Sequence, residues 1–224
     1  YSAERKGKAN SSKSEGVTLG GIIVDDATGE KIGARIYVQD AGGKYYFTET
    51  AAASGSAVRY EKRNWNNTNS VEIHTTLSAD PFAASLKPGE YSVTIERGKE
   101  YFPLTRKLAL GKGTKDETFR LKRWINMAER GWYSGDTHVH RELKDLPNLV
   151  QAEDLNVAFP LVYWVTKAFA PPTTGNKNLG GTIPDQLIKV DDTHVIYPRN
   201  TEYEIFTVNG KRHTLGAIFV LNHK

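Results

Sequence analysis

Short segments of alternating apolar and polar residues recur through the first half of this 224-residue chain. Each is bounded by Gly, Pro, Asp or Asn, and none shows the 3.6-residue period of a helix. They occupy residues 17–24, 34–40, 44–50, 70–76, 89–98 and 105–111. Short strands at this spacing predict an antiparallel β-sandwich over residues 17–122. The stretch 58–70, with Tyr60 and Trp65, interrupts the pattern and is expected to form a long surface loop.

Beyond residue 122 the pattern changes to that of a β plus α/β protein. Leu146, Leu149 and Val150 fall on one side of a predicted helix, and a continuous apolar run of strand length follows at 157–165. With a strand before the helix, this order predicts a βαβ unit. A second domain is therefore expected over residues 123–224. The loop-like segment 171–185 is long for a compact domain and is a candidate active-site loop.

Composition limits the classes of function. The net charge of +4 lies partly in residues 1–16, a polar stretch that we expect to be a disordered leader. The basic residues do not cluster as a nucleic-acid-binding face requires, and no apolar run is long enough for a membrane helix. The chain has no cysteine and begins at Tyr1, so it is either a processed product or a fragment. We expect an extracellular or periplasmic bacterial protein.

The segment "GDTHVH" at 135–140 carries two histidines behind a carboxylate. Because side chains alternate along a strand, Asp136, His138 and His140 share one face. Imidazole and carboxylate are ligands of Zn, Mn or Fe, and a neighbouring carboxylate such as Asp136 can orient an imidazole. Alternating histidines also occur on half-buried strands, so this pair indicates either a metal site or an ordinary half-buried strand.

A second set of polar residues follows near the C-terminal end. Asn209-Gly210 stands between two β-like runs and predicts a two-residue type I′ hairpin. Its register sets Val208 opposite Lys211 and directs further side chains to one side, namely Glu202, Glu204 and His213. Glu204 and His213 are then diagonal neighbours, within reach of one ion.

The segment "GWYSGDTHVH" resembles the first motif of the polymerase and histidinol phosphatase (PHP) superfamily of metal-dependent hydrolases. That motif has a Trp, then G-D-L-H-x-H, then an acidic residue five positions on, where this chain has Asp145. Glu204, or Glu202, and "His213-Thr214-Leu215-Gly216" match the later Glu-bearing strand and its hairpin partner. Within the superfamily the chain looks most like the CehA/McbA-like metallohydrolases, related to carbaryl hydrolase, whose members often follow a β-sandwich.

The resemblance implies an incomplete PHP-type β/α barrel that holds divalent transition-metal ions. It implies metal ligation by His138, His140, Glu204 and His213, and hydrolysis of a small-molecule phosphoester, carbamate, ester or amide by metal-activated water. Asp145 would be a further ligand or the catalytic base, although it also stands at a helix N-cap position. Asp136, Glu202 and His223 are additional candidates.

The chain departs from the PHP pattern in two places. The second family motif ends in Thr-Asp-His, whereas this chain has "VYWVTK", and the sequence stops soon after His223, before the remaining motifs. The second domain is therefore expected to be the N-terminal portion of the hydrolase, with at most a partial metal site and no robust turnover.

The segments "GGIIVDDATGEKIGARIYVQD" and "LKPGEYSVTIERG" resemble the carboxypeptidase-regulatory-like, or transthyretin-like, β-sandwich modules. Such modules are usually accessory domains. The alternative function is therefore a secreted binding or architectural protein whose sandwich recognises a glycan or protein partner, with Tyr60 and Trp65 as candidate contacts. His74 and His194 have no motif context and are expected to have surface or core roles.

Overall fold

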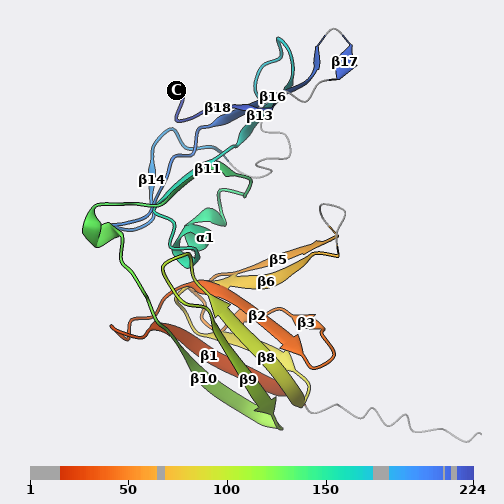
Figure 1. Ribbon diagram of the computed structural model, residues 1–224, viewed down its shortest axis with the longest axis vertical. Coiled ribbons are helices and arrows are strands. Elements are labelled where there is room, and N and C mark those ends of the chain that lie inside the picture. The colour runs from red at the N-terminus through yellow and green to blue at the C-terminus, as the bar shows by residue number, and fades with distance from the viewer. Residues whose placement is uncertain (1–15, 65–68, 174–181, 209, 213–215) are drawn as a thin grey trace, which may run out of the picture.

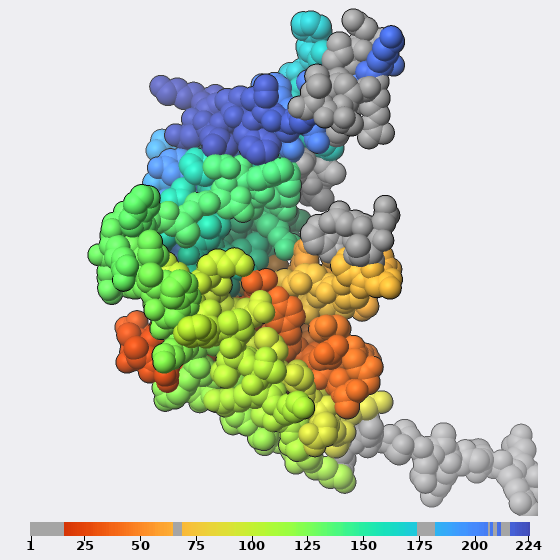
Figure 2. Space-filling model, in the orientation of Figure 1, coloured from red at the N-terminus to blue at the C-terminus, as the bar shows by residue number. Residues whose placement is uncertain are grey.

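A computed structural model of the chain describes residues 16–64, 69–173, 182–208, 210–212 and 216–224. Two units follow one another along the chain. The first is a β-sandwich that ends with strand β10, and the second lies above it in Figure 1. The space-filling view shows them as two lobes in contact, orange to yellow-green and green to blue (Figure 2). Residues 1–15, most of the predicted leader, lie outside the described residues.

The sandwich consists of two sheets. One has the strand order β10-β1-β7-β4, and the other has the order β5-β6-β2-β8-β9 with β3 paired to β2. The strands of the first sheet are β1 (Val17–Asp25), β4 (Glu49–Thr50), β7 (Phe82–Leu86) and β10 (Gly113–Leu121). Those of the second are β2 (Ala34–Asp40), β3 (Tyr45–Tyr46), β5 (Ala57–Arg63), β6 (Val71–Leu77), β8 (Gly89–Glu96) and β9 (Leu104–Leu110).

The alternating pattern of the sequence builds the core between these sheets. In β2, Ile36 and Val38 are completely buried, while the intervening Tyr37 and Gln39 face outward. Phe82 on β7 packs near Phe119 on β10, with ring centroids 6.1 Å apart. Apolar side chains from both sheets form one continuous cluster, so the prediction of a β-sandwich is confirmed.

Two details of the sandwich differ from the sequence-based expectation. Strands β1 and β10 pair in parallel over their whole length, from Val17 opposite Gly113 to Asp25 opposite Leu121, so the first sheet is mixed. Of the stretch 58–70 expected to be a long surface loop, residues 58–63 belong to β5, which pairs antiparallel with β6 and sets Tyr60 opposite His74. Trp65 lies outside the described residues.

The second unit contains two smaller sheets. One has the order β11-β12-β15-β14, and the other has β13-β16-β17 with β18 paired to β16. The first is built from β11 (Gly135–Val139), β12 (Val157–Pro160), β14 (Ile188–Lys189) and β15 (Val195–Ile196). The second is built from β13 (Tyr163–Lys167), β16 (Thr201–Val208), β17 (Lys211–Arg212) and β18 (Ile218–Val220). A 3-10 helix, η2 (Ala128–Arg130), lies in the connection from β10 to β11.

The predicted βαβ unit is present, because β11 and β12 pair in parallel with α1 (Leu146–Ala152) between them. Pro147 stands in the first turn of α1, where its missing N–H costs no helical hydrogen bond. Just beyond the helix, Asp154 has a positive φ of 51°, so the chain leaves the helical path there. Leu146 and Val150 are buried against Ala158 and Ile196, which form the core of this unit.

The PHP-type β/α barrel is not formed by the described residues. A β/α barrel needs a helix after each of its parallel strands. The described part of the second unit has one α-helix, α1, and its strands divide between two separate sheets. Antiparallel partners, β14 in one sheet and β17 and β18 in the other, replace the parallel strands that a barrel would require. The prediction of an incomplete PHP barrel is therefore corrected to two small mixed sheets.

Polar contacts join the two units. Arg97, which follows β8 and is 7% exposed, donates from Nη1 to the carbonyl oxygens of Gly33 (2.7 Å) and Gln151. Its Nη2 lies 2.6 Å from Oδ1 of Asp154. On the neighbouring side of α1, Asn148 Nδ2 donates to the Thr76 carbonyl at 3.0 Å. The helix is thereby fixed on the end of the six-stranded sheet (Figure 1).

Gly98 permits this close approach. Its φ is +47°, and a Cβ built there would overlap the carbonyl oxygen of Glu153 at the end of α1. Any larger residue would therefore have to push the two units apart. Among the described residues no helix is long and apolar enough to cross a membrane.

Candidate metal site

His138 and His140 stand at the end of β11. Strand alternation directs both side chains to the same side, as predicted, and the ring centroids are 4.7 Å apart in an edge-to-face arrangement. The pairing of β11 with β12 is irregular between Asp136 and Val139, which is the segment that carries His138. The two side chains are 51% and 37% exposed, so their outer edges can be reached from solvent.

Glu202 on β16 lies close to both rings. Its side chain is 4% exposed. The Nε2 atom of His138 lies 3.8 Å from Oε1 of Glu202, and Nε2 of His140 lies 3.6 Å from Oε2. Each imidazole thus faces one oxygen of the same carboxylate. The site joins the two small sheets, because His138 lies on β11, with His140 just after that strand, and Glu202 lies on β16.

Phe219 on β18 forms a wall of this site. It lies opposite Glu202 in the pairing of β16 and β18, and its ring centroid is 4.6 Å from that of His138. Packing against an aromatic ring restricts the orientation of His138. The site therefore has a buried carboxylate on its inner side, an aromatic ring along one side and an outer edge open to solvent.

The separations suit a transition-metal ion. One ligand atom from each of His138, His140 and Glu202 can be chosen so that all lie within 4.8 Å of one another. In a tetrahedral zinc site with bonds of about 2.0–2.1 Å, neighbouring ligand atoms are about 3.4 Å apart. The distances of 3.6 and 3.8 Å require only small side-chain rotations to reach this value. Two imidazoles and a carboxylate also form a ligand set typical of Zn, Mn or Fe.

The other predicted ligands lie elsewhere or outside the described residues. The carboxylate of Glu204 accepts a hydrogen bond from Trp164 Nε1 at 3.2 Å, and Glu204 is not part of the three-residue cluster. His213 lies outside the described residues, although Val208 does pair with Lys211 as the hairpin register predicts.

Three further candidates have structural positions. Asp145 occupies the N-cap position of α1 but makes no side-chain capping bond, and it does not belong to the cluster. Asp136 Oδ1 accepts a hydrogen bond from the backbone N–H of His138 at 2.8 Å, a contact with the backbone and not with an imidazole. His223 Nε2 lies 2.7 Å from the Thr201 hydroxyl. Their predicted roles in catalysis or metal ligation stay predictions.

The two histidines without motif context are buried. His74 is 6% exposed, with Nδ1 2.7 Å from Glu72 Oε1 and its ring 5.2 Å from that of Tyr60. Burial lowers the pKa of His74, and the neighbouring Glu72 opposes that effect only in part. His194 is 5% exposed, with Nδ1 2.9 Å from Asp191 Oδ1. Both therefore have core roles.

Tyr60, the candidate contact for a glycan or protein partner, lies in a cleft beside a cationic side chain. The guanidinium of Arg141 lies over its ring at 4.3 Å. The two side chains line a cleft of about 650 Å³ between the sandwich and the second unit, together with His74. Val139 and Arg141 also line this cleft and alternate along the chain with His138 and His140. Asp136 also lines this cleft, whereas His138 and His140 do not, so Asp136 does not share the face of the two histidines as predicted.

Comparison with known proteins gives little further information. No protein-family model matches the chain, and no curated protein matches it. A pilus 2b backbone protein of group B streptococcus is similar in structure at 20% identity and a TM-score of 0.32, over 47% of this chain and 40% of that protein. A putative carbohydrate-binding protein of Bacteroides uniformis ATCC 8492 is similar at 16% identity and a TM-score of 0.28, over 49% and 43%.

These findings correct the prediction of a PHP-type hydrolase. The described residues of the second unit form two small mixed sheets and no β/α barrel, the fold on which the PHP prediction depended. A hydrolytic function and an ester or phosphoester substrate are accordingly not assigned. The resemblance of the first unit to carboxypeptidase-regulatory-like modules stays a prediction.

Proposed function

We propose that this protein is a binding protein whose second unit holds one divalent transition-metal ion, Zn, Mn or Fe, on His138, His140 and Glu202. The observation that supports this proposal is the position of both imidazole Nε2 atoms over the two oxygens of one buried carboxylate, at 3.8 and 3.6 Å. Burying a carboxylate is unfavourable without a compensating cation or hydrogen bonds. A metal ion shared with the two imidazoles would place a cation beside this buried carboxylate.

Three protein ligands leave a coordination position open. Structural zinc sites are closed by four protein ligands, whereas a three-ligand site completes its coordination with water or a group from another molecule. Here the exposed edges of His138 and His140 would lie on the solvent side of the ion. The ion could then bridge this protein to a carboxylate or imidazole of a partner.

Metal analysis of the full chain tests the proposal. Protein freed of any affinity tag is stripped with a chelator, incubated with Zn²⁺, Mn²⁺ or Fe²⁺, desalted and analysed for bound metal. We expect close to one equivalent of the preferred ion. His138→Ala, His140→Ala and Glu202→Gln should each lower the affinity by about 10–100-fold or more.

Two matched controls sharpen this experiment. His223→Ala and Glu204→Gln remove the same chemical groups from positions outside the cluster and should retain the ion. Absence of stoichiometric metal in the wild type would exclude the site. Loss of metal in Glu204→Gln with retention in Glu202→Gln would show that the predicted Glu204 is the ligand.

A further inference from the structure

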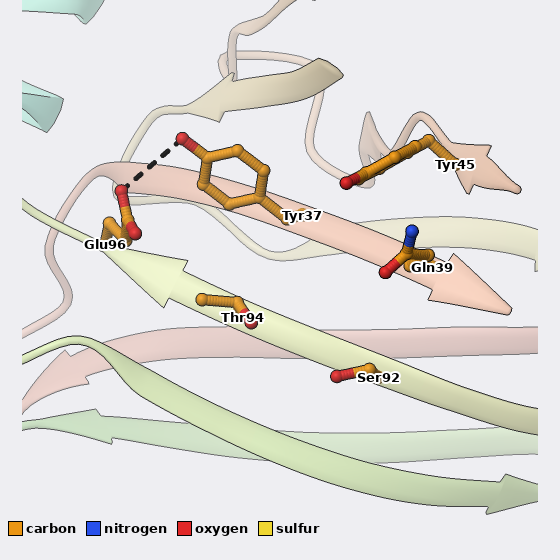
Figure 3. A pocket seen from close by; sticks show the side chains of 6 residues that line it. All are labelled: Tyr37, Gln39, Tyr45, Ser92, Thr94 and Glu96. Atoms are coloured by element: carbon orange, nitrogen blue, oxygen red, sulfur yellow. Dashed lines mark hydrogen bonds between the residues drawn. The ribbon is translucent and has the colours of Figure 1, made fainter. Parts of the chain in front are cut away.

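The outer face of the six-stranded sheet carries a small pocket, which we call the tyrosine pocket. The inward-facing side chains of β2 and β8, such as Ile36 and Val93, are completely buried in the core. The residues between them therefore point outward to the solvent side. The tyrosine pocket is lined by Tyr37, Gln39, Tyr45, Ser92, Thr94 and Glu96 (Figure 3).

Strand register determines the arrangement of these side chains. Tyr37 lies opposite Thr94, and Gln39 lies opposite Ser92, so the two strands present a small grid of side chains. Tyr45 on β3 lies opposite Gln39 on its other side. Figure 3 shows the Tyr45 hydroxyl directed from β3 toward Tyr37. The two phenol rings thus stand at opposite ends of a polar floor.

The ring of Tyr37 is held in position. Its hydroxyl donates to Glu72 Oε1 at 2.8 Å and accepts from Arg35 Nη1 at 3.2 Å. Its contact with Glu96 Oε2 is longer, at 3.4 Å, and marks one end of the pocket in Figure 3. An aromatic ring fixed in this way loses little conformational entropy when a ligand packs on it.

Several polar groups in the pocket are open to a ligand. Among the described residues, the hydroxyls of Tyr45 and Ser92 make no hydrogen bond, and the side-chain bond of Gln39 to Gly43 uses only its Nε2. The contacts of Glu96 with Tyr37 and Arg35 fall on Oε2. The available groups are therefore both donors and acceptors. A ligand with several adjacent hydroxyls can pair with both kinds.

Size and charge narrow the class of ligand. The pocket volume is about 180 Å³, which suits one sugar ring and is far smaller than the surface that a protein interface buries. Of the six lining side chains only Glu96 is charged, so an anionic ligand would meet a carboxylate. Hydrogen-bonding groups beside aromatic rings suit the polar edge and apolar face of a pyranose.

We propose that the tyrosine pocket binds one neutral hexopyranose unit of a glycan. This site lies in the sandwich and is independent of the metal site proposed for the second unit. The phenols of Tyr37 and Tyr45 contact the ring, while Gln39, Ser92 and Glu96 pair with its hydroxyls.

Saturation-transfer NMR with the full chain tests this inference. The probes are the methyl glycosides of glucose, galactose and mannose, with methyl glucuronide as an anionic comparison. At least one neutral glycoside is expected to receive saturation, and the glucuronide is expected to bind more weakly than the neutral sugar. No transfer to any of the three neutral glycosides, or stronger binding of the glucuronide, would overturn the proposal.

Matched variants localise the binding. Tyr45→Ala and Gln39→Ala should weaken the affinity by about tenfold, and Tyr45→Phe, which removes only a hydroxyl, by less. Tyr133→Ala removes a 63% exposed tyrosine outside the pocket and should have no effect. Glycoside binding unchanged in Tyr45→Ala and Gln39→Ala would refute the site.

A further variant separates this inference from the proposed metal function. His138→Ala should retain glycoside binding while it loses metal, because it lies in the other unit. If both are lost while the circular dichroism spectrum is unchanged, the tyrosine pocket is not an independent site and the inference fails.

Discussion

The two units of this protein are stabilised in different ways. Of the described residues, eighteen buried hydrophobic ones form the core of the sandwich, whereas six form that of the second unit. The sandwich strands pair over as many as nine residues, while β12 and β15 pair over two. A small core supplies little hydrophobic stabilisation. The second unit must therefore rely more on its contacts with the sandwich, and its own sites depend on that support.

The interface that supplies this support is polar and largely buried. Asp154 receives Arg97 on one carboxylate oxygen and Arg123 on the other, at 2.6 and 2.8 Å. Arg123 also lies 2.7 Å from Glu100. Such networks favour one relative arrangement, because a partner left alone in a buried position is unfavourable. We therefore expect substitutions in the sandwich core to destabilise the sandwich most, and substitutions at the interface to destabilise the second unit most.

The largest effect is expected in the sandwich core. Phe82→Ala removes a side chain that is 1% exposed and packs against Phe119. The free energy of unfolding should fall by about 3–5 kcal/mol, measured by urea denaturation followed by circular dichroism. Phe102→Ala, at a position 54% exposed, is the matched control and should change it by about 0.5 kcal/mol or less. Similar losses for both would show that the sandwich core is not what stabilises the unit.

A somewhat smaller and more selective effect is expected at the interface. Arg97→Ala leaves two carbonyl groups and one carboxylate oxygen of Asp154 without their donor. It should lower the free energy of unfolding by about 3 kcal/mol. Three of the four tryptophans lie at 124, 132 and 164, so fluorescence mainly reports residues beyond the sandwich. We expect the fluorescence transition to move to lower urea than the circular dichroism transition.

The control for this prediction is an exposed ion pair. Arg59 and Glu49 are 56% and 73% exposed, so Arg59→Ala should change the stability by about 1 kcal/mol or less. A single transition in Arg97→Ala, with both probes shifted equally, would contradict the idea that the second unit separates first.

Metal should stabilise the second unit and not the sandwich. At a free ion concentration one hundred times the dissociation constant, binding to the native state contributes about 2.7 kcal/mol. Thermal unfolding followed by tryptophan fluorescence should therefore shift upward with added ion in the wild type. The shift should be absent in His140→Ala and present in His223→Ala. An equal shift in His140→Ala would locate the stabilising ion elsewhere.

The smallest effect is expected from the titration of His74 in the sandwich. Burial lowers its pKa, so the unfolded chain takes up a proton at this residue more readily than the folded protein. The stability associated with the neutral, buried His74 is fully present above its unfolded pKa of about 6.5. It is lost as the pH falls through the lower pKa that His74 has in the folded protein. Glu72, Arg35 and Arg141 surround the ring electrostatically and set the size of this effect.

Urea denaturation at several pH values between 5 and 8 checks this sign. Wild-type stability should decrease toward pH 5 more steeply than that of His74→Gln. His223→Gln changes a histidine of the second unit. The free energy of unfolding of the sandwich should depend on pH in this variant as it does in the wild type. A slope in His74→Gln equal to that of the wild type would contradict the prediction.

Much of the local structure followed from the sequence. The alternating segment at 34–40 is strand β2 with the predicted bounds, and the strand, helix and strand around residue 150 form the predicted βαβ unit. The pairing of Val208 with Lys211 also followed from Asn209-Gly210. These features depend on neighbours within a few residues, where side-chain period and turn chemistry determine the backbone.

The sites were predicted less completely. His138 and His140 were identified because alternation along one strand places them together, and Glu202 was only a secondary candidate beside Glu204. The sequence pattern also showed that Tyr37 and Gln39 alternate with buried residues, but it did not show that Tyr45 on β3 would close a pocket over them. Nothing in the sequence around Arg97 indicated that it would bind the end of a helix more than fifty residues away.

The sequence by itself determined where strands and α1 form, which of their faces are apolar, and that two imidazoles project together from β11. Only the tertiary structure decided that Glu202 meets those imidazoles, that β1 pairs in parallel with β10, and that the second unit forms two sheets instead of a barrel. The physical reason is that period and turn signals act within one element, whereas the meeting of two sheets depends on how distant elements pack. A shift of two residues along β16, which keeps the same face, is enough to exchange Glu202 for Glu204.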